Sequence, residues 1–212
     1  MDPEEARAKL DAARLYLVTD GRDGGQELRT FLDEVLGAGV DVIQLREKEL
    51  EAGPILERAE IFREACDHHG VPFIVNDRAD LTFAAGADGV HLGQDDLPVG
   101  AARHLLGRNV IIGRSTHDPD QLRRAEAEDV DYLAVGPVHE TPTKPGRPAA
   151  GTDLVRLAAA EVRKPWFAIG GIDDSNLDEV RTAGATRIVV VRAVTLSGDP
   201  GAAVKGLRAA LG

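Results

Sequence analysis

Four groups of polar and charged residues directly follow short apolar segments of this chain. Gln44-Leu45-Arg46-Glu47-Lys48 follows apolar residues 40–43, Asn76-Asp77 follows residues 72–75, and residues 91–96 follow Gly89-Val90. A fourth group, Thr141-Pro142-Thr143-Lys144, follows residues 132–138. If the apolar segments are neighbouring parallel strands, these cations and carboxylates meet at one end of a barrel. Such a mixture suits a magnesium-bound diphosphate and predicts an enzyme that acts on phosphorylated small molecules.

Short apolar segments alternate with longer amphipathic segments along the whole chain. We expect strands at residues 15–19, 40–45, 72–76, 89–92, 110–113, 132–136, 166–170 and 187–191, and helices at residues 27–38, 53–68, 118–128 and 175–183. Continuous apolar segments indicate strands buried on both faces, as parallel sheets require. Glycines in residues 37–41, 86–90 and 184–188 are typical of helix ends. Asp118-Pro119, and less clearly Gly53-Pro54, predict helix starts.

Eight strand–helix units in 212 residues predict an α/β fold, a single-domain TIM (β/α)8 barrel that covers residues 1–212. Residues 1–13 would form an N-terminal extension or helix. Length alone also allows two small domains, but no linker divides the chain. An open doubly wound sheet is the main alternative, yet residues 19–25 resemble its glycine-rich fingerprint only in composition.

Composition excludes several classes of partner. The formal net charge of −11 argues against a nucleic-acid or anionic-membrane surface, because both need a basic face. No apolar segment is long enough to span a bilayer. The acidic N-terminus lacks the features of a signal peptide, so we expect a cytoplasmic protein. The single cysteine, Cys66, is expected to be a buried apolar residue in a reducing compartment.

Arg46 and Lys48 are candidate ligands of an anion. Side chains two residues apart in an extended segment point the same way, so both cations can contact one diphosphate. Gln44 shares their parity and can donate a hydrogen bond to a substrate. The structural alternative is a solvated loop in which Glu47 and Glu49 pair with the cations.

Asp77 and either Asp95 or Asp96 are candidate ligands of a hard cation. The two segments end consecutive strands, which are adjacent in a barrel. Mg²⁺ takes one or two carboxylates together with phosphate oxygens. The alternative role for each aspartate is a turn or helix cap.

Other strand ends carry weaker signals. His91 is more often a hydrogen-bonded core residue than a catalyst, and His117 is as compatible with a helix start as with a function. His68 and His69 have no catalytic signal. Residues 136–146 are rich in Pro and Gly, which is typical of an active-site lid; the alternative is a surface loop that the prolines stiffen. The loops at residues 169–172 and 190–193 are expected to bind a phosphate through backbone amides.

Taken together, short segments in a fixed order closely resemble the thiamine phosphate synthase family, also called thiamine-phosphate pyrophosphorylase. The matching segments are Tyr16-Leu17-Val18-Thr19, Gln44-Leu45-Arg46-Glu47-Lys48, Asn76-Asp77, residues 86–96, Gly113-Arg114-Ser115-Thr116-His117, Gly136-Pro137-Val138, residues 141–146 and Ala168-Ile169-Gly170-Gly171-Ile172. They span nearly the whole chain, and the ordered set is highly specific.

The resemblance implies a Mg²⁺-dependent transferase of thiamine biosynthesis. It would join a hydroxymethylpyrimidine diphosphate to a thiazole phosphate and release pyrophosphate. Its small-molecule substrates would be its partners, and a homodimer is possible. The pyrimidine diphosphate would contact Gln44, Leu45, Arg46, Glu47, Lys48, Asn76, Ser115 and Lys144, with Arg46, Lys48 and Lys144 as catalytic residues. Asp77 and Asp96 would bind the metal, and the thiazole phosphate would contact Thr141, Pro142, Thr143, Gly171, Val191 and Arg192.

The sequence departs from the family pattern at a few positions. Serine is common in the family where this chain has Arg192, and apolar residues are common at Arg114 and at His139-Glu140. Three alternatives to the synthase are considered. A thiazole tautomerase of the same barrel would need an acid–base residue such as His91 or His117. A non-catalytic sensor of thiamine phosphates would need no leaving-group machinery. A sugar-phosphate aldolase or isomerase would need a Schiff-base lysine or an acid–base pair, for which Lys48 and Lys144 are the only candidates.

Overall fold

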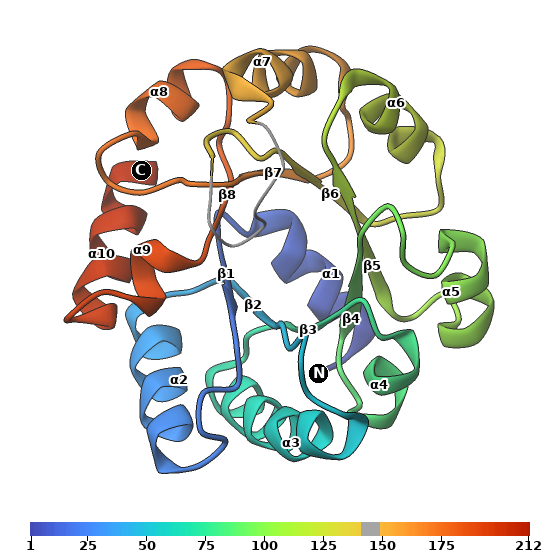
Figure 1. The fold of residues 1–212 in the computed structure, drawn as a ribbon, viewed down its shortest axis with the longest axis vertical. Coiled ribbons are helices and arrows are strands. Elements are labelled where there is room, and N and C mark those ends of the chain that lie inside the picture. The colour runs from blue at the N-terminus through green and yellow to red at the C-terminus, as the bar shows by residue number, and fades with distance from the viewer. Residues whose placement is uncertain (141–148) are drawn as a thin grey trace.

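Eight parallel strands form a closed barrel in the computed structural model, which describes residues 1–140 and 149–212. Each strand pairs with its neighbours in sequence, and β8 closes the sheet against β1 (Figure 1). The strands are β1 (Leu15–Thr19), β2 (Val42–Leu45), β3 (Phe73–Asn76), β4 (Gly89–Leu92), β5 (Ile111–Thr116), β6 (Tyr132–Val135), β7 (Trp166–Ile169) and β8 (Ile188–Val190). The predicted TIM barrel is therefore confirmed.

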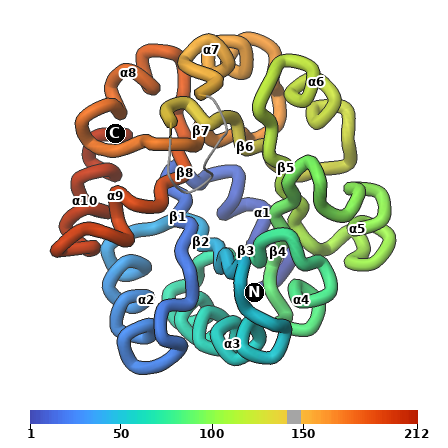
Figure 2. Tube along the Cα trace, in the orientation of Figure 1, coloured from blue at the N-terminus to red at the C-terminus, as the bar shows by residue number. Residues whose placement is uncertain are grey.

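Helices surround the barrel and one helix covers an end of it (Figures 1 and 2). They are α1 (Pro3–Ala12), α2 (Gln26–Ala38), α3 (Ala52–His69), α4 (Ala79–Ala84), α5 (Val99–Leu106), α6 (Pro119–Ala127), α7 (Gly151–Glu161), α8 (Leu177–Thr182), α9 (Arg192–Thr195) and α10 (Pro200–Leu211). None of them, within the residues described, is long and apolar enough to cross a membrane.

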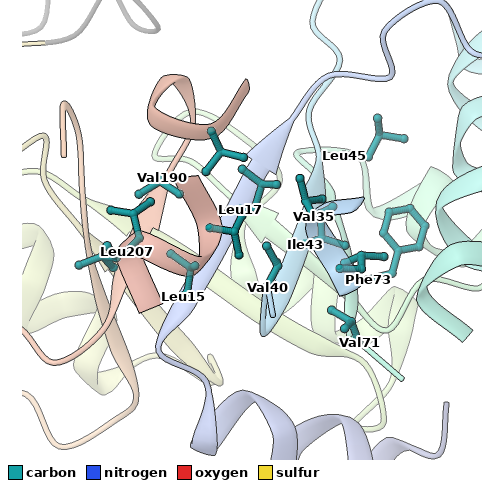
Figure 3. Close-up of a cluster of buried hydrophobic side chains, with 14 of the residues drawn as sticks. Leu15, Leu17, Val35, Val40, Ile43, Leu45, Val71, Phe73, Val190 and Leu207 are labelled. Atoms are coloured by element: carbon teal, nitrogen blue, oxygen red, sulfur yellow. The ribbon is translucent and has the colours of Figure 1, made fainter. Parts of the chain in front are cut away.

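Two layers of apolar side chains hold this arrangement. The outer layer lies between the strands and the helices; Figure 3 shows part of it, where Leu17, Ile43 and Phe73 pack near Val35 of α2. The inner layer fills the barrel and joins inward-facing strand residues to Ala6, Leu10 and Ala13 at α1. Residues 1–13 are thus mainly a helix that closes the barrel at the amino ends of the strands.

Most expected element bounds agree with the structure to within one or two residues. The largest difference is β5, which continues to Thr116, so that Ser115 and Thr116 lie within the strand instead of after it. The helix start at Asp118-Pro119 is confirmed, because the Asp118 carboxylate accepts a hydrogen bond from the Gln121 amide at 2.8 Å. The start at Gly53-Pro54 is wrong: α3 already begins at Ala52, after an N-cap residue, Glu51, that makes no side-chain cap.

Candidate active site

A cavity of about 390 Å³ opens at the carboxyl ends of the strands. Seven of the residues expected to contact substrate line it: Gln44, Arg46, Asn76, Ser115, Gly171, Val191 and Arg192. They come from the ends of β2, β3, β5, β7 and β8 or the loops that follow. Closure of the barrel therefore brings together side chains that are far apart in the sequence. The volume is within the range of small-molecule sites.

Asp77 and Asp96 lie together beside this cavity. Both burial and a hydrogen bond with Asp96 raise the pKa of Asp77, whereas Lys48 lowers it by a smaller amount. Lys48 forms an ion pair with Asp77. Asp96 also accepts a hydrogen bond from the Gly93 amide at 2.6 Å, and the neighbouring Asp95 is exposed. The structure thus favours Asp96 over Asp95 as the partner of Asp77.

Asp77 adopts a backbone conformation that non-glycine residues use rarely. Its φ is +62°, and its amide donates to the His91 carbonyl at 2.8 Å. Aspartate and asparagine tolerate this left-handed region better than other side chains do. Unusual backbone conformations are common at functional sites, where the surrounding structure enforces them. Here the turn at the end of β3 directs the Asp77 carboxylate toward Asp96 and Lys48.

Asn76 carries a buried donor that has no acceptor among the described residues. Its side chain lines the cavity and is 8% exposed, and Nδ2 makes no hydrogen bond there. An unsatisfied buried amide costs about 1–3 kcal/mol, so such groups in native structures need an explanation. A ligand that offers an acceptor beside Asn76 would supply the missing hydrogen bond.

Some residues of the segment 44–48 line the cavity, and others pack against or bind the surrounding structure. Arg46 lines the cavity and has no carboxylate within ion-pair distance among the described residues. Leu45 is 1% exposed and packs in the outer apolar layer, so only its backbone can reach a substrate. Glu47 accepts from the Gly21 amide at 2.7 Å and lies 3.6 Å from Arg58.

Consequently Glu47 does not pair with Arg46 or Lys48, which was the structural alternative considered for this loop. Its carboxylate instead fixes the loop after β1 to α3. Lys48 pairs with Asp77 and is not among the residues that line the cavity. Arg46 and Lys48 therefore contact different parts of the site.

The loops after β7 and β8 form another side of the cavity. Gly170 and Gly171 have φ of +106° and +64°, and a Cβ at Gly171 would lie 2.8 Å from His139 Cβ. Glycine is therefore needed for both the conformation and the close approach. Val191 precedes the single-turn helix α9, and Arg192 begins it with its side chain exposed at the cavity.

Four expected site residues, Thr141, Pro142, Thr143 and Lys144, lie outside the described residues. Their roles toward the thiazole phosphate and the pyrimidine diphosphate stay predictions.

The histidines divide into structural and cavity-lining residues. His91 is buried, with Nδ1 2.9 Å from the Tyr132 hydroxyl and Nε2 2.8 Å from Ser115 Oγ. His117 also lines the cavity, and its Nδ1 is 2.5 Å from the Gly136 carbonyl. His68 and His69 lie at the carboxyl end of α3, where His69 contacts Asp33 at 2.8 Å. That end of the helix is remote from the cavity.

Two tyrosines at or directly behind the cavity had no expected role. Tyr16 and Tyr132 face the barrel interior, and their hydroxyls are 2.9 Å apart. Both stand at or near the start of an apolar strand, where an aromatic residue is ordinarily read as packing. Hydroxyl groups inside a barrel need polar partners, which is the signal that could have identified them.

Arg114, one of the departures from the family pattern, is accommodated outside the cavity. Its guanidinium donates to the Gly93 carbonyl and lies 3.5 Å from Glu128. Arg114 thereby connects β5 to the loop after β4, the loop that also holds Asp96.

This geometry defines a (β/α)8-barrel protein with a small-molecule site at its mouth, equipped with carboxylates, cations and hydrogen-bond donors. A family model described as thiamine monophosphate synthase matches residues 15–194. The chain belongs to this family.

Relatives agree over almost the full length. The chain is 56% identical over 207 residues to a thiamine-phosphate synthase from Acidothermus cellulolyticus, covering 97% of this chain and 98% of the relative. It is 54% identical over 207 residues to a thiamine-phosphate synthase from Thermobifida fusca, covering 97% of this chain and 95% of the relative. Among solved structures, a thiamine phosphate pyrophosphorylase from Pyrococcus furiosus aligns with a TM-score of 0.86 and 32% identity, covering 97% of this chain and 96% of that one.

Proposed function

We propose that this chain is a thiamine-phosphate synthase. It transfers the hydroxymethylpyrimidine group from its diphosphate to the ring nitrogen of a thiazole phosphate, which gives thiamine phosphate and pyrophosphate. The observation that carries the proposal is the contact of Asp77 with Asp96 beside Lys48, next to a cavity of about 390 Å³. Its membership of the thiamine monophosphate synthase family and its relatives of 54–56% identity support the same activity.

Magnesium is the proposed metal of this site. Asp77 and Asp96 supply hard oxygen ligands, which Mg²⁺ prefers. Burial and the neighbouring Asp96 raise the pKa of Asp77, and a bound cation would relieve the repulsion between the two carboxylates. When bound, Mg²⁺ would neutralise negative charge on the diphosphate oxygens.

The cavity residues are proposed to bind the pyrimidine diphosphate. Asn76 Nδ2 offers an unsatisfied donor, and Arg46 offers a guanidinium without a carboxylate partner among the described residues. Arginine suits phosphate oxygens because its planar fork donates two parallel hydrogen bonds. Gln44 and Ser115 reach the same cavity from β2 and β5. These contacts hold the ring and fix its diphosphate at the mouth.

The reaction needs stabilisation of a leaving group more than it needs a base. The bond between the methylene carbon and the diphosphate oxygen breaks, and its electron pair leaves with pyrophosphate. The aminopyrimidine stabilises the resulting benzylic-type cation, and the thiazole nitrogen lone pair then forms the new C–N bond. No proton has to be removed from the nucleophile. Arg46 and Lys48 provide positive charge where negative charge develops.

The thiazole phosphate is proposed to bind at the loops after β7 and β8. Gly171 permits close approach of the backbone, and Val191 with Arg192 borders the same side of the cavity. Arg192 adds a positive charge where a serine hydroxyl is common in the family. We expect it to contribute to phosphate binding through charge.

A tautomerase reaction fits this site less well. Both ring nitrogens of His91 already contact protein hydroxyl groups, so the ring is engaged as a structural residue. The tautomerase also has no need of the Asp77–Asp96 pair. A homodimer and a cytoplasmic location stay predictions.

One experiment tests the proposed function. Purified protein is given both substrates and Mg²⁺, and pyrophosphate and thiamine phosphate are measured over time. We expect the two products to appear in equal amounts. Interconversion of thiazole phosphate tautomers without pyrophosphate release would replace this proposal with the tautomerase, and binding of thiamine phosphate without either reaction would replace it with the sensor.

A further inference from the structure

Five buried polar side chains form one continuous hydrogen-bonded chain across the barrel interior, here called the polar relay. Gln44 Nε2 donates to the Tyr16 hydroxyl at 2.6 Å, and this hydroxyl lies 2.9 Å from that of Tyr132. The Tyr132 hydroxyl lies 2.9 Å from His91 Nδ1, and His91 Nε2 lies 2.8 Å from Ser115 Oγ. Each of the five residues is at most 7% exposed. The relay begins at Gln44 and ends at Ser115; Tyr16 and His91 between them also line the cavity, whereas Tyr132 lies behind them in the barrel interior.

Donor counting gives the relay a direction. An amide nitrogen can only donate, so Tyr16 accepts from Gln44 and uses its own proton toward Tyr132. Tyr132 in turn donates to His91 Nδ1. His91 must then carry its proton on Nε2, where it donates to Ser115 Oγ. The Ser115 proton is not used within the relay, so it can be donated to a ligand.

The tyrosines are held as neutral donors. Burial raises the pKa of Tyr16 and of Tyr132 above its ordinary value, so both hydroxyls keep their protons. Tyr132 also packs edge-on against Tyr16 and Phe167, with ring centroids 5.8 Å apart in each pair. A Cβ at Gly113 would lie 2.1 Å from the Tyr132 ring, so glycine makes room for it. Packing thus holds the relay in one geometry.

We propose that Tyr16, Tyr132 and His91 are positioning residues that fix the hydrogen-bonding polarity of Gln44 and Ser115 toward the substrate. Nε2 of Gln44 donates one of its two protons to Tyr16, and the amide oxygen, which has no role within the relay, accepts a hydrogen bond from the substrate. Ser115, at the other end, is set to donate one. This inference rests on the proposed function, whose aminopyrimidine substrate has an exocyclic amino donor and ring-nitrogen acceptors. The relay would therefore select the 4-amino ring over a 4-oxo ring.

Selection follows because the two ends cannot reverse separately. Reversal at Gln44 requires a flip of its amide, and each of the next three groups must then reverse, including the tautomer of His91. A partial reversal places two donors or two acceptors against each other in a buried position, which is unfavourable. A substrate with a carbonyl in place of the amino group would place an acceptor against the Gln44 amide oxygen. To bind it well, every hydrogen bond of the relay would have to reverse, and not that of Gln44 alone.

The first test is the tautomer of His91, measured by ¹⁵N NMR of the ring nitrogens in the intact protein. His91→Asn identifies the resonances. We expect wild-type His91 to be neutral with its proton on Nε2, and Tyr132→Phe to mix the tautomers because Nδ1 loses its donor. A proton on Nδ1 in the wild type would overturn the proposed direction. This readout does not depend on catalysis.

The second test is discrimination between the pyrimidine diphosphate and its 4-oxo analogue. Tyr16→Phe and Tyr132→Phe should each lower the preference for the amino ring in kcat/KM by about tenfold or more, mainly through KM. Thr116→Val is the matched control. Thr116 follows Ser115 in β5, and its buried hydroxyl donates to the Ala134 carbonyl of β6 at 3.1 Å, outside the relay. The control should keep the wild-type preference.

The outcomes separate this inference from the proposed function. If Thr116→Val and the tyrosine variants lose the preference for the amino ring equally, the relay is not a positioning device. The same conclusion follows if none of these variants loses that preference. Absence of pyrophosphate release in the wild type would reject the synthase activity instead. In that case calorimetric binding of the two rings replaces kcat/KM, and the His91 tautomer still decides the direction of the relay.

Discussion

At the residue scale, the site depends on two carboxylates that the fold forces together. Asp77 leaves β3 through a left-handed turn with φ of +62°, and Asp96 lies in the loop after the adjacent strand. Burial and Asp96 both raise the pKa of Asp77, while the ion pair with Lys48 compensates only in part. The charges that would bind the metal therefore cost stability when no metal is present.

The Asp77→Asn variant tests this cost. A raised pKa in the folded state means that the carboxyl stabilises the fold below its unfolded pKa, and that this contribution is lost as pH rises through the folded pKa. Without Mg²⁺ at pH 7, Asp77→Asn should therefore have a higher Tm than the wild type, and the difference should shrink as pH falls toward 4. Asparagine also tolerates the left-handed turn.

Activity should change in the opposite direction. We expect Asp77→Asn to lower kcat at least about 100-fold, because charge stabilisation in the transition state is lost. Thermal unfolding in EDTA and the rate of pyrophosphate release measure the two effects. Asp174→Asn, at an exposed position, serves as the control that should change neither. A destabilised Asp77→Asn variant would show that the carboxylate pair is structural.

Cys66 gives a second prediction at this scale. Its side chain is fully buried, and burial raises the pKa of the thiol. Because the thiolate is the reactive form, the folded protein should resist a thiol reagent at pH 8 and react once it is unfolded in guanidinium. Rapid labelling of the folded protein would contradict the packing of α3 described above.

At the scale of elements, the ends of strands and the loops after them carry the chemistry. Period-two alternation directs Gln44, His91 and Ser115 into the barrel, while Leu45 and Leu92 point to the outer helices. Alternation relates Gln44, Arg46 and Lys48 to one another already in the sequence, but it does not show which face is the inner one, because parallel strands buried on both faces are apolar throughout. Parity therefore explains why Leu45 contributes only its backbone to the site.

The loop after β7 can be tested with one glycine. Gly171→Ala should destabilise the protein by about 1–2 kcal/mol, because alanine disfavours a φ of +64°. It should also raise the KM for the thiazole phosphate, since a Cβ would press on His139. The measurements are urea unfolding and steady-state kinetics.

Gly206→Ala is the matched control, since a Cβ there meets nothing within 4 Å in the exposed face of α10. It should stabilise the helix by roughly 0.5–1 kcal/mol and leave KM unchanged. Equal behaviour of the two variants would show that the conformation of Gly171 is unimportant for the site.

At the scale of the whole molecule, much of the arrangement could be predicted from sequence. Alternating apolar and amphipathic segments were sufficient to predict the closed barrel, and the order of strands placed Asp77 near either Asp95 or Asp96. The Tyr16–Tyr132 contact could not be predicted in the same way, because it joins residues 116 positions apart through the barrel interior. The same holds for Glu47, whose partners Gly21 and Arg58 come from two other loops or helices.

Closure of the barrel by α1 gives a prediction at this scale. Leu10 is 1% exposed and packs with the inner layer, so Leu10→Ala should cost about 2–5 kcal/mol of unfolding free energy. Leu105→Ala, at a side chain that is 52% exposed, is the control and should cost far less. Similar losses from the two variants would mean that α1 does not contribute to the core.

The acidic molecule must capture an anionic leaving group locally, and this is the claim on which the account depends. Calorimetric titration of pyrophosphate at fixed free Mg²⁺ tests it most directly. We predict that Mg²⁺ tightens binding about tenfold or more in the wild type, within the range of coupling between two sites, and that Asp96→Asn abolishes this gain. Pyrophosphate affinity in the wild type that is the same with and without Mg²⁺ would contradict the account.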